Sequence, residues 1–143
     1  MPSNHSEEYL GVIYRLRATP GQPLPLPRLR EYLQYSPISI HEMVQKLEKQ
    51  NLVKYSRYHG VTLTGAGERI ATALVRRHRI WERFLMDQLN IPLDDVHEIA
   101  GRLEHAAPED VTERLADFMG DPQHCPHGSQ IPLLPPVDQD FPT

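Results

Sequence analysis

The hydrophobic residues in the first fifty positions recur every three or four residues, which is the period of an amphipathic helix. This spacing predicts a helix over residues 6–18, with Ser6 as its N-cap, and a shorter helix over 27–33 after a proline-rich turn. A further apolar stripe predicts a third helix over 36–50, which Ser36 caps.

The pattern then changes to two short strands and returns to helix for most of the remaining chain. The expected elements are strands at 52–57 and 61–63 and helices at 64–90, 93–106 and 108–119. Thr64 is a candidate cap for the first of these helices, which is expected to run without a break. From Gly120 onward the sequence is rich in proline and is expected to be irregular.

The order of these elements is typical of one DNA-binding architecture. Three helices followed by a two-stranded hairpin form a winged helix-turn-helix, in which the third helix enters the major groove and the hairpin contacts the backbone. The chain is therefore expected to be mostly α, with this fold at its N-terminus and further helices behind it.

The charge of the chain is divided between its two halves. Residues 1–80 hold 12 Lys/Arg and 6 Asp/Glu, whereas residues 81–143 hold 3 Lys/Arg and 13 Asp/Glu. A basic half favours a polyanionic partner, most commonly nucleic acid, and an acidic half with histidines favours cations. A chance imbalance of charge is the alternative.

Composition also limits where the protein works. The single Cys125 excludes an intrachain disulfide and fits a reducing compartment. No apolar run is long enough to cross a bilayer, and the N-terminus lacks the apolar core of a signal peptide. The expected location is therefore the cytoplasm, with no membrane partner.

The polar face of the helix over 36–50 would carry most of the DNA contacts. Glutamine pairs with adenine, serine can serve several base edges, and lysine and arginine mostly meet phosphates. The candidate DNA-binding residues are Ser36, Ser39, His41, Glu42, Gln45, Lys46, Lys49, Arg57 and His59, with Lys54 as a further phosphate contact. The alternative is an ordinary amphipathic helix with a solvated face, against which the hairpin and the local positive charge argue.

Histidines and carboxylates recur on the helices of the second half. His97, Glu104 and His105 stand at i, i+7 and i+8, so a helix places them on one face beside its apolar stripe. His78 and Glu82, one turn apart on the preceding helix, flank its buried face. If the two helices pack antiparallel, these side chains converge into a ligand set that suits Mn(II), Fe(II), Co(II) or Zn(II). A hydrogen-bonded interior histidine is the alternative.

Three further residues, outside the helices of the second half, have ligand chemistry. Cys125 and His127, in the tail sequence CPHG, offer a thiolate and an imidazole that can both reach one ion. Glu8 lies on the first helix, where a solvated charge that complements the helix dipole is the alternative.

Several classes of function are open on these grounds. A metalloenzyme also uses histidine and carboxylate ligands, but the sequence has no HExxH, no nucleophile elbow and no phosphate loop. No enzymatic activity and no small-molecule substrate are therefore expected. The remaining alternatives are a winged-helix regulator whose effector is not a metal and a protein-binding winged-helix module, which would lack salt-dependent DNA affinity.

Six segments carry a resemblance to a known family. They are EEYLGVIYRL, PISIHEMVQKLEKQNLV, LTGAGERIA, RRHRIWERFL, VHEIAGRLEH and CPHGSQIP, spread over about residues 6–134. They resemble the diphtheria-toxin-repressor family of metal-dependent transcriptional regulators. The resemblance implies a winged-helix domain over 1–72 and a helical metal-binding and dimerisation domain over 73–143, joined by the helix that begins near Thr64. It also implies a homodimer that binds a palindromic operator when Mn(II) or Fe(II) is abundant and so represses metal uptake.

The same resemblance implies two metal sites. The ligands that it implies are His78, Glu82 and His97 for the first site, and Glu8, Glu104 and His105 for the second. A carboxylate at position 8 in place of a thioether favours Mn(II) over Fe(II), while Zn(II) and Co(II) stay open.

The chain departs from the family pattern at the second site. Gly101 stands where a Cys or Glu usually provides a ligand, and Gly11 stands where manganese-type members carry a carboxylate. Water, or Cys125 and His127 from the tail, would complete the coordination. Many members also carry a small β-barrel domain after the tail, for which a chain of 143 residues is too short. A two-domain, manganese-regulator-like branch is therefore expected, or a truncated form of a longer protein.

Overall fold

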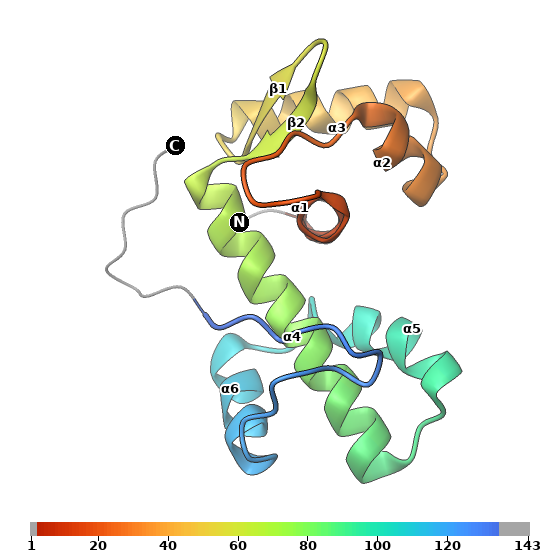
Figure 1. Ribbon diagram of the computed structural model, residues 1–143, viewed down its shortest axis with the longest axis vertical. Helices are drawn as coiled ribbons and strands as arrows, with labels where there is room; N and C mark the ends of the chain where they lie inside the picture. Colours follow the sequence, from red (N-terminus) through yellow and green to blue (C-terminus); the bar gives the residue numbers. More distant parts are fainter. Residues whose placement is uncertain (1–2, 135–143) are drawn as a thin grey trace. The chain divides into compact units, whose positions relative to one another are not determined.

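A long helix, α4 (Gly65–Leu89), is shared between two parts of the chain (Figure 1). The computed structural model describes residues 3–134, which divide into a first unit over 3–71 and a second unit over 72–134. The first residues of α4 belong to the first unit and the remainder to the second. No helix among the described residues is long and apolar enough to cross a bilayer.

The first unit contains the helices and the hairpin in the order that the sequence predicts. Its elements are α1 (Asn4–Leu16), α2 (Leu26–Leu33), α3 (Pro37–Lys49), β1 (Val53–Ser56) and β2 (Gly60–Leu63). The two strands pair antiparallel, with Val53 opposite Leu63. Leu24 extends this small sheet, because its backbone exchanges two hydrogen bonds with that of Val61. The predicted winged helix-turn-helix and the mostly helical fold class are confirmed.

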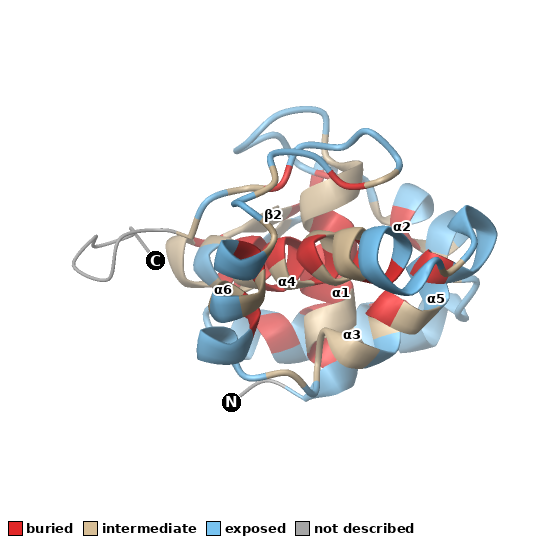
Figure 2. Cartoon of the chain, turned by 90° about the horizontal axis from the view of Figure 1, so that it is seen from below, coloured by how far each residue is buried: buried red, intermediate tan, exposed pale blue. Residues whose placement is uncertain are grey.

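The core of the first unit is formed by one face of each helix and the inner face of the hairpin. Figure 2 shows buried residues on the inner faces of the helices and exposed residues on their outer faces. The largest fully buried side chains include Tyr9, Leu10, Ile13, Leu29, Ile40, Val44, Leu47, Val53 and Val61. Each such side chain contributes about 1.5–3 kcal/mol relative to an exposed one, so this core holds α3 firmly with its polar face outward.

Two of the three predicted helix caps are confirmed and one is wrong. Ser36 Oγ accepts a hydrogen bond of 3.1 Å from the backbone of Ser39, and Thr64 caps α4 in the same manner. Helix α1 begins at Asn4, so Ser3 accepts the capping hydrogen bond and Ser6, the predicted cap, is its donor. The two serines stand three residues apart, and the apolar pattern does not distinguish between them.

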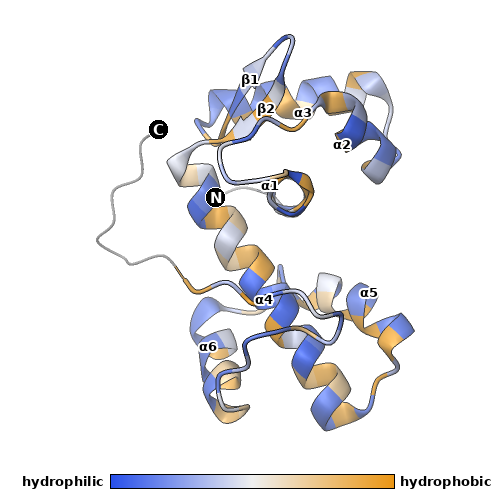
Figure 3. Ribbon diagram, viewed as in Figure 1, coloured by the Kyte–Doolittle hydropathy of each residue, from blue (hydrophilic) through white to orange (hydrophobic). Residues whose placement is uncertain are grey.

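The second unit packs two short helices and the tail against α4. Helix α5 (Leu93–Leu103) contributes Val96 and Ala100 to a cluster with Leu85 of α4. Helix α6 (Glu109–Phe118) and the tail contribute Ala116 and Ile131 to a cluster with Ile80. Figure 3 shows hydrophobic and hydrophilic residues alternating along α4, as expected for a helix with only part of its surface buried.

The second unit differs from the sequence prediction at the end of α5. The helix ends at Leu103, and residues 104–106 form a turn rather than a last helical turn. Pro108 prevents the helix from continuing past residue 107, and the backbone of Ala106 and of Ala107 donates to Leu103 O in the turn that ends it. The tail is irregular as predicted, but Cys125 and Ile131 are buried. The part of the predicted tail beyond residue 134 lies outside the described residues.

Candidate metal centre and nucleic-acid interface

Glu82 lies at the centre of a group of imidazoles in the second unit. Its Oε2 atom is 3.5 Å from His78 Nε2, 3.5 Å from His97 Nδ1 and 3.2 Å from His127 Nδ1. The two atoms His78 Nε2 and His97 Nδ1 are 3.0 Å apart. Glu82 and His78 are buried, whereas His97 and His127 are exposed. An ion can therefore reach the buried carboxylate from the side of His97 and His127.

Local structure explains why these side chains meet. His78 and Glu82 are one turn apart on α4, so they share a face. The packing of Val96 and Ala100 against α4 brings His97, between them in the sequence, to the edge of that interface. The predicted convergence of the two helical stripes is thus present in the structure.

A tight loop in the tail adds a thiol and a third imidazole. Cys125 N donates a hydrogen bond of 2.8 Å to Ser129 O, and Gly128 N donates one of 2.9 Å to Cys125 O. Gly128 has a φ of 91°, a conformation that glycine adopts without strain. Ligand atoms of Glu82, Cys125 and His127 all lie within 4.8 Å of one another, as do those of His78, Glu82 and His97. Water or the tail motif was expected to complete the second site, and the structure places the tail motif beside Glu82 of the first site instead.

The donor group, defined as His78, Glu82, His97, Cys125 and His127, fits a bound transition-metal ion. Two ligand atoms about 2.1 Å from one ion and about 109° apart are separated by about 3.4 Å. The distances from Glu82 Oε2 to the three imidazoles, 3.2 to 3.5 Å, agree with that separation. Among the described residues, Glu82 Oε2 and His78 Nδ1 are also buried without an aligned hydrogen bond. A cation would satisfy the first of these atoms.

The imidazoles and the carboxylates change each other's protonation. Burial alone would raise the pKa of Glu82, but the adjoining imidazoles of His78 and His97 outweigh it and hold the pKa at about 2. Burial alone would lower the pKa of His78, but the carboxylates of Glu104 and Glu82 outweigh it and raise the pKa above the usual 6.5. Glu82 is therefore a carboxylate at neutral pH and available as a ligand.

His78 connects the donor group to the predicted second site. Its Nδ1 atom lies 3.0 Å from Glu104 Oε2, and Glu104 Oε1 lies 3.4 Å from His105 Nε2. A contact of this kind fixes the orientation of a ligating imidazole and increases its basicity. The sequence did not reveal it, because the contact depends on the turn that carries Glu104 beyond the end of α5.

The remaining predicted ligand, Glu8, lies on α1 in the first unit. Its Oε1 atom accepts a hydrogen bond of 2.9 Å from the hydroxyl of Tyr35 and lies 3.8 Å from His5 Nε2. Glu8 and the Glu104–His105 pair belong to different units, so their common role as ligands stays a prediction.

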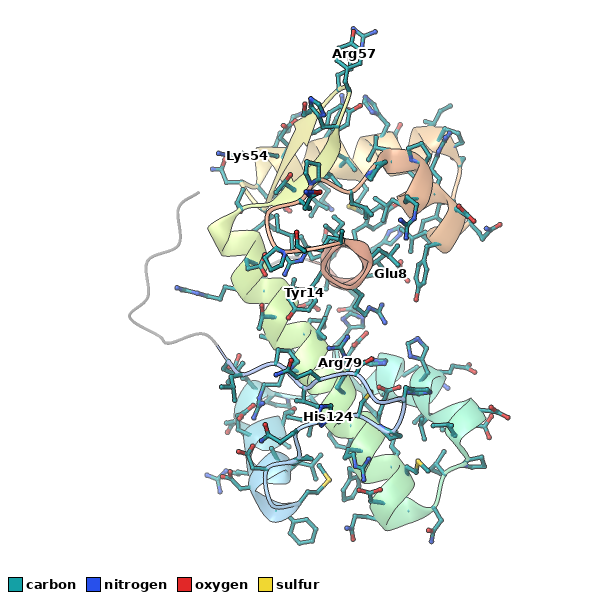
Figure 4. All side chains as sticks on the ribbon, in the orientation of Figure 1. Glu8, Tyr14, Lys54, Arg57, Arg79 and His124 are labelled. Carbon is teal, nitrogen blue, oxygen red and sulfur yellow. The ribbon has the colours of Figure 1, made fainter. Side chains whose placement is uncertain are left out.

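The predicted DNA-binding residues are all exposed on α3 and the hairpin. Figure 4 shows Arg57 at the tip of the hairpin and Lys54 projecting from β1. The hydroxyls of Ser36 and Ser39 are 3.0 Å apart within the helix cap, so the hydroxyl of Ser36 is already engaged there.

Sequence reasoning missed two exposed side chains on this surface. Ile38, at the start of α3, is 71% exposed, and Tyr58, in the hairpin turn, is 85% exposed. The sequence signal for Ile38 is an isoleucine that stands outside the apolar stripe of Ile40, Val44 and Leu47. The start of α3 also borders a shallow hollow of about 580 Å³ toward α2, lined by Leu26, Arg30, Pro37, Ile38, Ile40, His41, Glu42 and Gln45.

Comparison with known proteins finds matches over both units. Residues 1–61 match the family model described as the iron-dependent repressor N-terminal DNA-binding domain. Residues 64–133 match the model described as the iron-dependent repressor metal-binding and dimerisation domain.

Individual relatives agree with these models. The chain is 35% identical over 129 residues to the iron-dependent repressor IdeR of Mycobacterium leprae, covering 90% of this chain and 56% of the relative. It is 33% identical to the diphtheria toxin repressor of Corynebacterium diphtheriae, covering 90% and 57%. A solved manganese-dependent transcriptional repressor in complex with manganese superposes with a TM-score of 0.80 at 36% identity, covering 96% of this chain and 62% of that one. The chain thus spans somewhat more than half the length of the curated relatives that it matches.

Proposed function

Because the chain belongs to the family of iron-dependent repressors, we propose that it is a cytoplasmic, metal-dependent repressor of genes for manganese or iron homeostasis. The observation that carries this proposal is the donor group around Glu82, present in the same chain as a winged helix whose outer face is polar and exposed. A homodimer would present two copies of α3 to a palindromic operator. The half-sites would then lie about one helical turn of DNA apart, roughly 34 Å, or a multiple of it.

The two proposed sets of ligands differ in chemical hardness. The donor group contains a thiol and three imidazoles beside one carboxylate, and such ligands favour Fe(II), Co(II) or Zn(II). The second set, Glu8, Glu104 and His105, is richer in carboxylate and favours Mn(II). When bound, the ion supplies positive charge that holds these side chains together, and no redox or bond-forming chemistry is required of it.

The residues around the donor group have distinct roles in this proposal. Glu82 supplies the central negative charge, and its low pKa keeps it ionised at any physiological pH. Glu104 orients His78, because its carboxylate lies against the ring nitrogen that faces away from Glu82. Metal binding to these groups would be coupled to DNA binding, and linkage requires that DNA binding increase metal affinity by the same factor.

The experiment that tests the function is selection of random-sequence duplexes by the purified protein with Mn(II) or Fe(II). The affinity for the selected duplexes is then measured again after chelation with EDTA, with the metal content of the protein determined by elemental analysis. We expect a palindrome that is bound with metal and lost after metal removal.

A matched pair of variants makes the test specific. Glu82→Gln preserves the shape of the side chain but removes its charge, and should reduce metal-stimulated binding. Glu98→Gln makes the same change at an exposed position of α5 and should leave binding unchanged. Binding that persists in the metal-free protein would contradict the metal switch, and the absence of any selected sequence would favour a protein-binding winged-helix module.

A further inference from the structure

The outward face of α3 has a carboxylate at its centre. The buried residues Ile40, Val44 and Leu47 define the inner face of the helix. At 100° per residue, Ile38, Glu42, Gln45 and Lys49 form the stripe on the opposite side, and Glu42 lies near the middle of that stripe. If α3 enters the major groove, its buried face points away from the DNA. Glu42, on the opposite side of the helix, would then face the base edges.

Glu42 has no partner that explains its presence there. Among the described residues, its carboxylate makes no hydrogen bond and no ion pair, and the side chain is exposed. By contrast, Glu48 on the same helix accepts a hydrogen bond of 3.1 Å from the backbone of Tyr55. Glu42 is therefore not needed for the fold of the first unit.

An isolated carboxylate is unfavourable on a surface that binds phosphates unless it meets a hydrogen-bond donor. An ionised carboxylate can only accept hydrogen bonds. In the major groove, cytosine presents the N4 amino donor, whereas guanine presents the acceptors N7 and O6 and thymine presents the acceptor O4. Adenine presents a donor beside an acceptor, so it is the second choice.

We propose that Glu42 selects cytosine at one position of each operator half-site and disfavours guanine and thymine there. The inference rests on the proposed function, since it assumes that α3 enters the major groove, and it adds the identity of a base that the protein reads. Gln45, one turn further along the stripe, is a separate contact, because its amide both donates and accepts and is suited to adenine.

The test is parallel selection of random duplexes with Mn(II) by the full chain and two variants. Glu42→Gln has the same shape but a donor and an acceptor, so it should move the selected base from cytosine to adenine and leave the other positions of the consensus unchanged. Glu31→Gln makes the same charge change on an exposed position of α2 and should keep cytosine. In the parent protein, replacing the selected cytosine by thymine should weaken binding by about tenfold or more.

The outcomes separate this inference from the proposed function. If Glu42→Gln selects the same consensus palindrome as the parent protein, the role of Glu42 is overturned, and the repressor function still stands. A uniform increase in affinity of Glu42→Gln for all sequences would also overturn it, because Glu42 would then only repel phosphates. If the parent protein selects no duplex, the proposed function fails and this inference with it. Metal affinity of each variant, measured by calorimetry, verifies that the variants remain folded.

Discussion

The hydroxyl of Tyr35 donates a hydrogen bond of 2.9 Å to Oε1 of Glu8. Tyr35 immediately precedes Ser36, the cap of α3, and Glu8 is on α1. The rings of Tyr9 and Tyr35 are stacked with their centroids 6.1 Å apart, which adds a second contact between the same two segments. A proposed metal ligand is thus in direct contact with the residue that precedes the cap of α3.

This contact predicts that Tyr35→Phe weakens Mn(II) binding by about tenfold, because a carboxylate loses the group that orients it. Calorimetric titration with Mn(II) measures the effect. The control is Tyr32→Phe, which removes a hydroxyl from an exposed tyrosine on α2 and should leave the affinity unchanged. Tyr35→Phe is also introduced into the Glu8→Gln variant. If it lowers Mn(II) affinity there by the same factor as in the parent protein, Tyr35 does not act through Glu8.

The shifted pKa values of His78 and Glu82 predict opposite effects of pH on the metal-free protein. The pKa of His78 is raised, so its stabilisation is fully present below pH 6.5 and is lost as the pH rises through the raised value. The pKa of Glu82 is lowered from 4.5 to about 2, so its stabilisation is present above pH 4.5 and is lost as the pH falls toward 2. These two groups therefore stabilise the metal-free second unit most between pH 4.5 and 6.5.

The affinity for metal should change with pH in the opposite sense to the stabilisation by His78, increasing as the pH rises above 6.5. The proton on His78 must leave before its nitrogen becomes a ligand, so affinity for Fe(II) or Co(II) should increase with pH across the raised pKa. Calorimetry in two buffers of different ionisation enthalpy measures the protons released on binding. His78→Gln should reduce that number, and an unchanged number would mean that His78 does not lose a proton on metal binding.

The sequence predicted those parts of the fold that depend on residues close to one another along the chain. Ser36 and Pro37 specify the start of α3 by themselves, and the spacing of His78 and Glu82 specifies a shared face on α4. The meeting of His97 with that pair required only that two adjacent helices pack through their apolar stripes.

The features that the sequence did not reveal depend on distant contacts. Cys125 and His127 reach Glu82 because Ile131 is buried against Ile80 and Ala116, which holds the tail in place. The backbone of Ile131 also donates a hydrogen bond of 2.8 Å to Gln123, which closes the loop. No periodic pattern indicates such a loop, so the sequence identified Cys125 and His127 as candidate ligands but did not reveal that they lie beside Glu82.

Gly101 provides a further prediction, because a Cβ at this position would meet no atom within 4 Å. It lies inside α5, where replacing glycine by alanine should increase the free energy of unfolding by about 0.5–1 kcal/mol.

Gly101→Glu should give a similar gain in stability. It also adds a carboxylate one turn before Glu104 and His105, so it should increase Mn(II) affinity by about tenfold. Denaturant unfolding and Mn(II) titration measure the two effects, and Gly101→Ala separates helix propensity from ligation. Equal Mn(II) affinities for the two variants would argue against a second site that includes Glu104 and His105.

Cys125 provides the last prediction, because it is the thiol of the donor group and is only 4% exposed. If its thiolate binds the ion, the Co(II) complex should show a sulfur-to-metal charge-transfer band in the near ultraviolet, and Cys125→Ser should lose that band. Serine is close in size, and the backbone hydrogen bond from residue 125 to Ser129 O does not depend on the side chain, so the loop should keep its conformation.

Cys125→Ser should shift the metal preference of the protein away from Zn(II) and Co(II) and toward Mn(II). Zn(II) and Co(II) affinity should fall by about tenfold or more, because these ions bind thiolate strongly, whereas Mn(II) affinity should change little, because Mn(II) prefers oxygen ligands. Ser129→Ala is the matched control, since it alters a side chain in the same loop without removing a ligand. An intact charge-transfer band in Cys125→Ser would exclude the thiol as a ligand, and a parallel loss of affinity for all three ions would indicate that Cys125 supports the loop rather than selecting the metal.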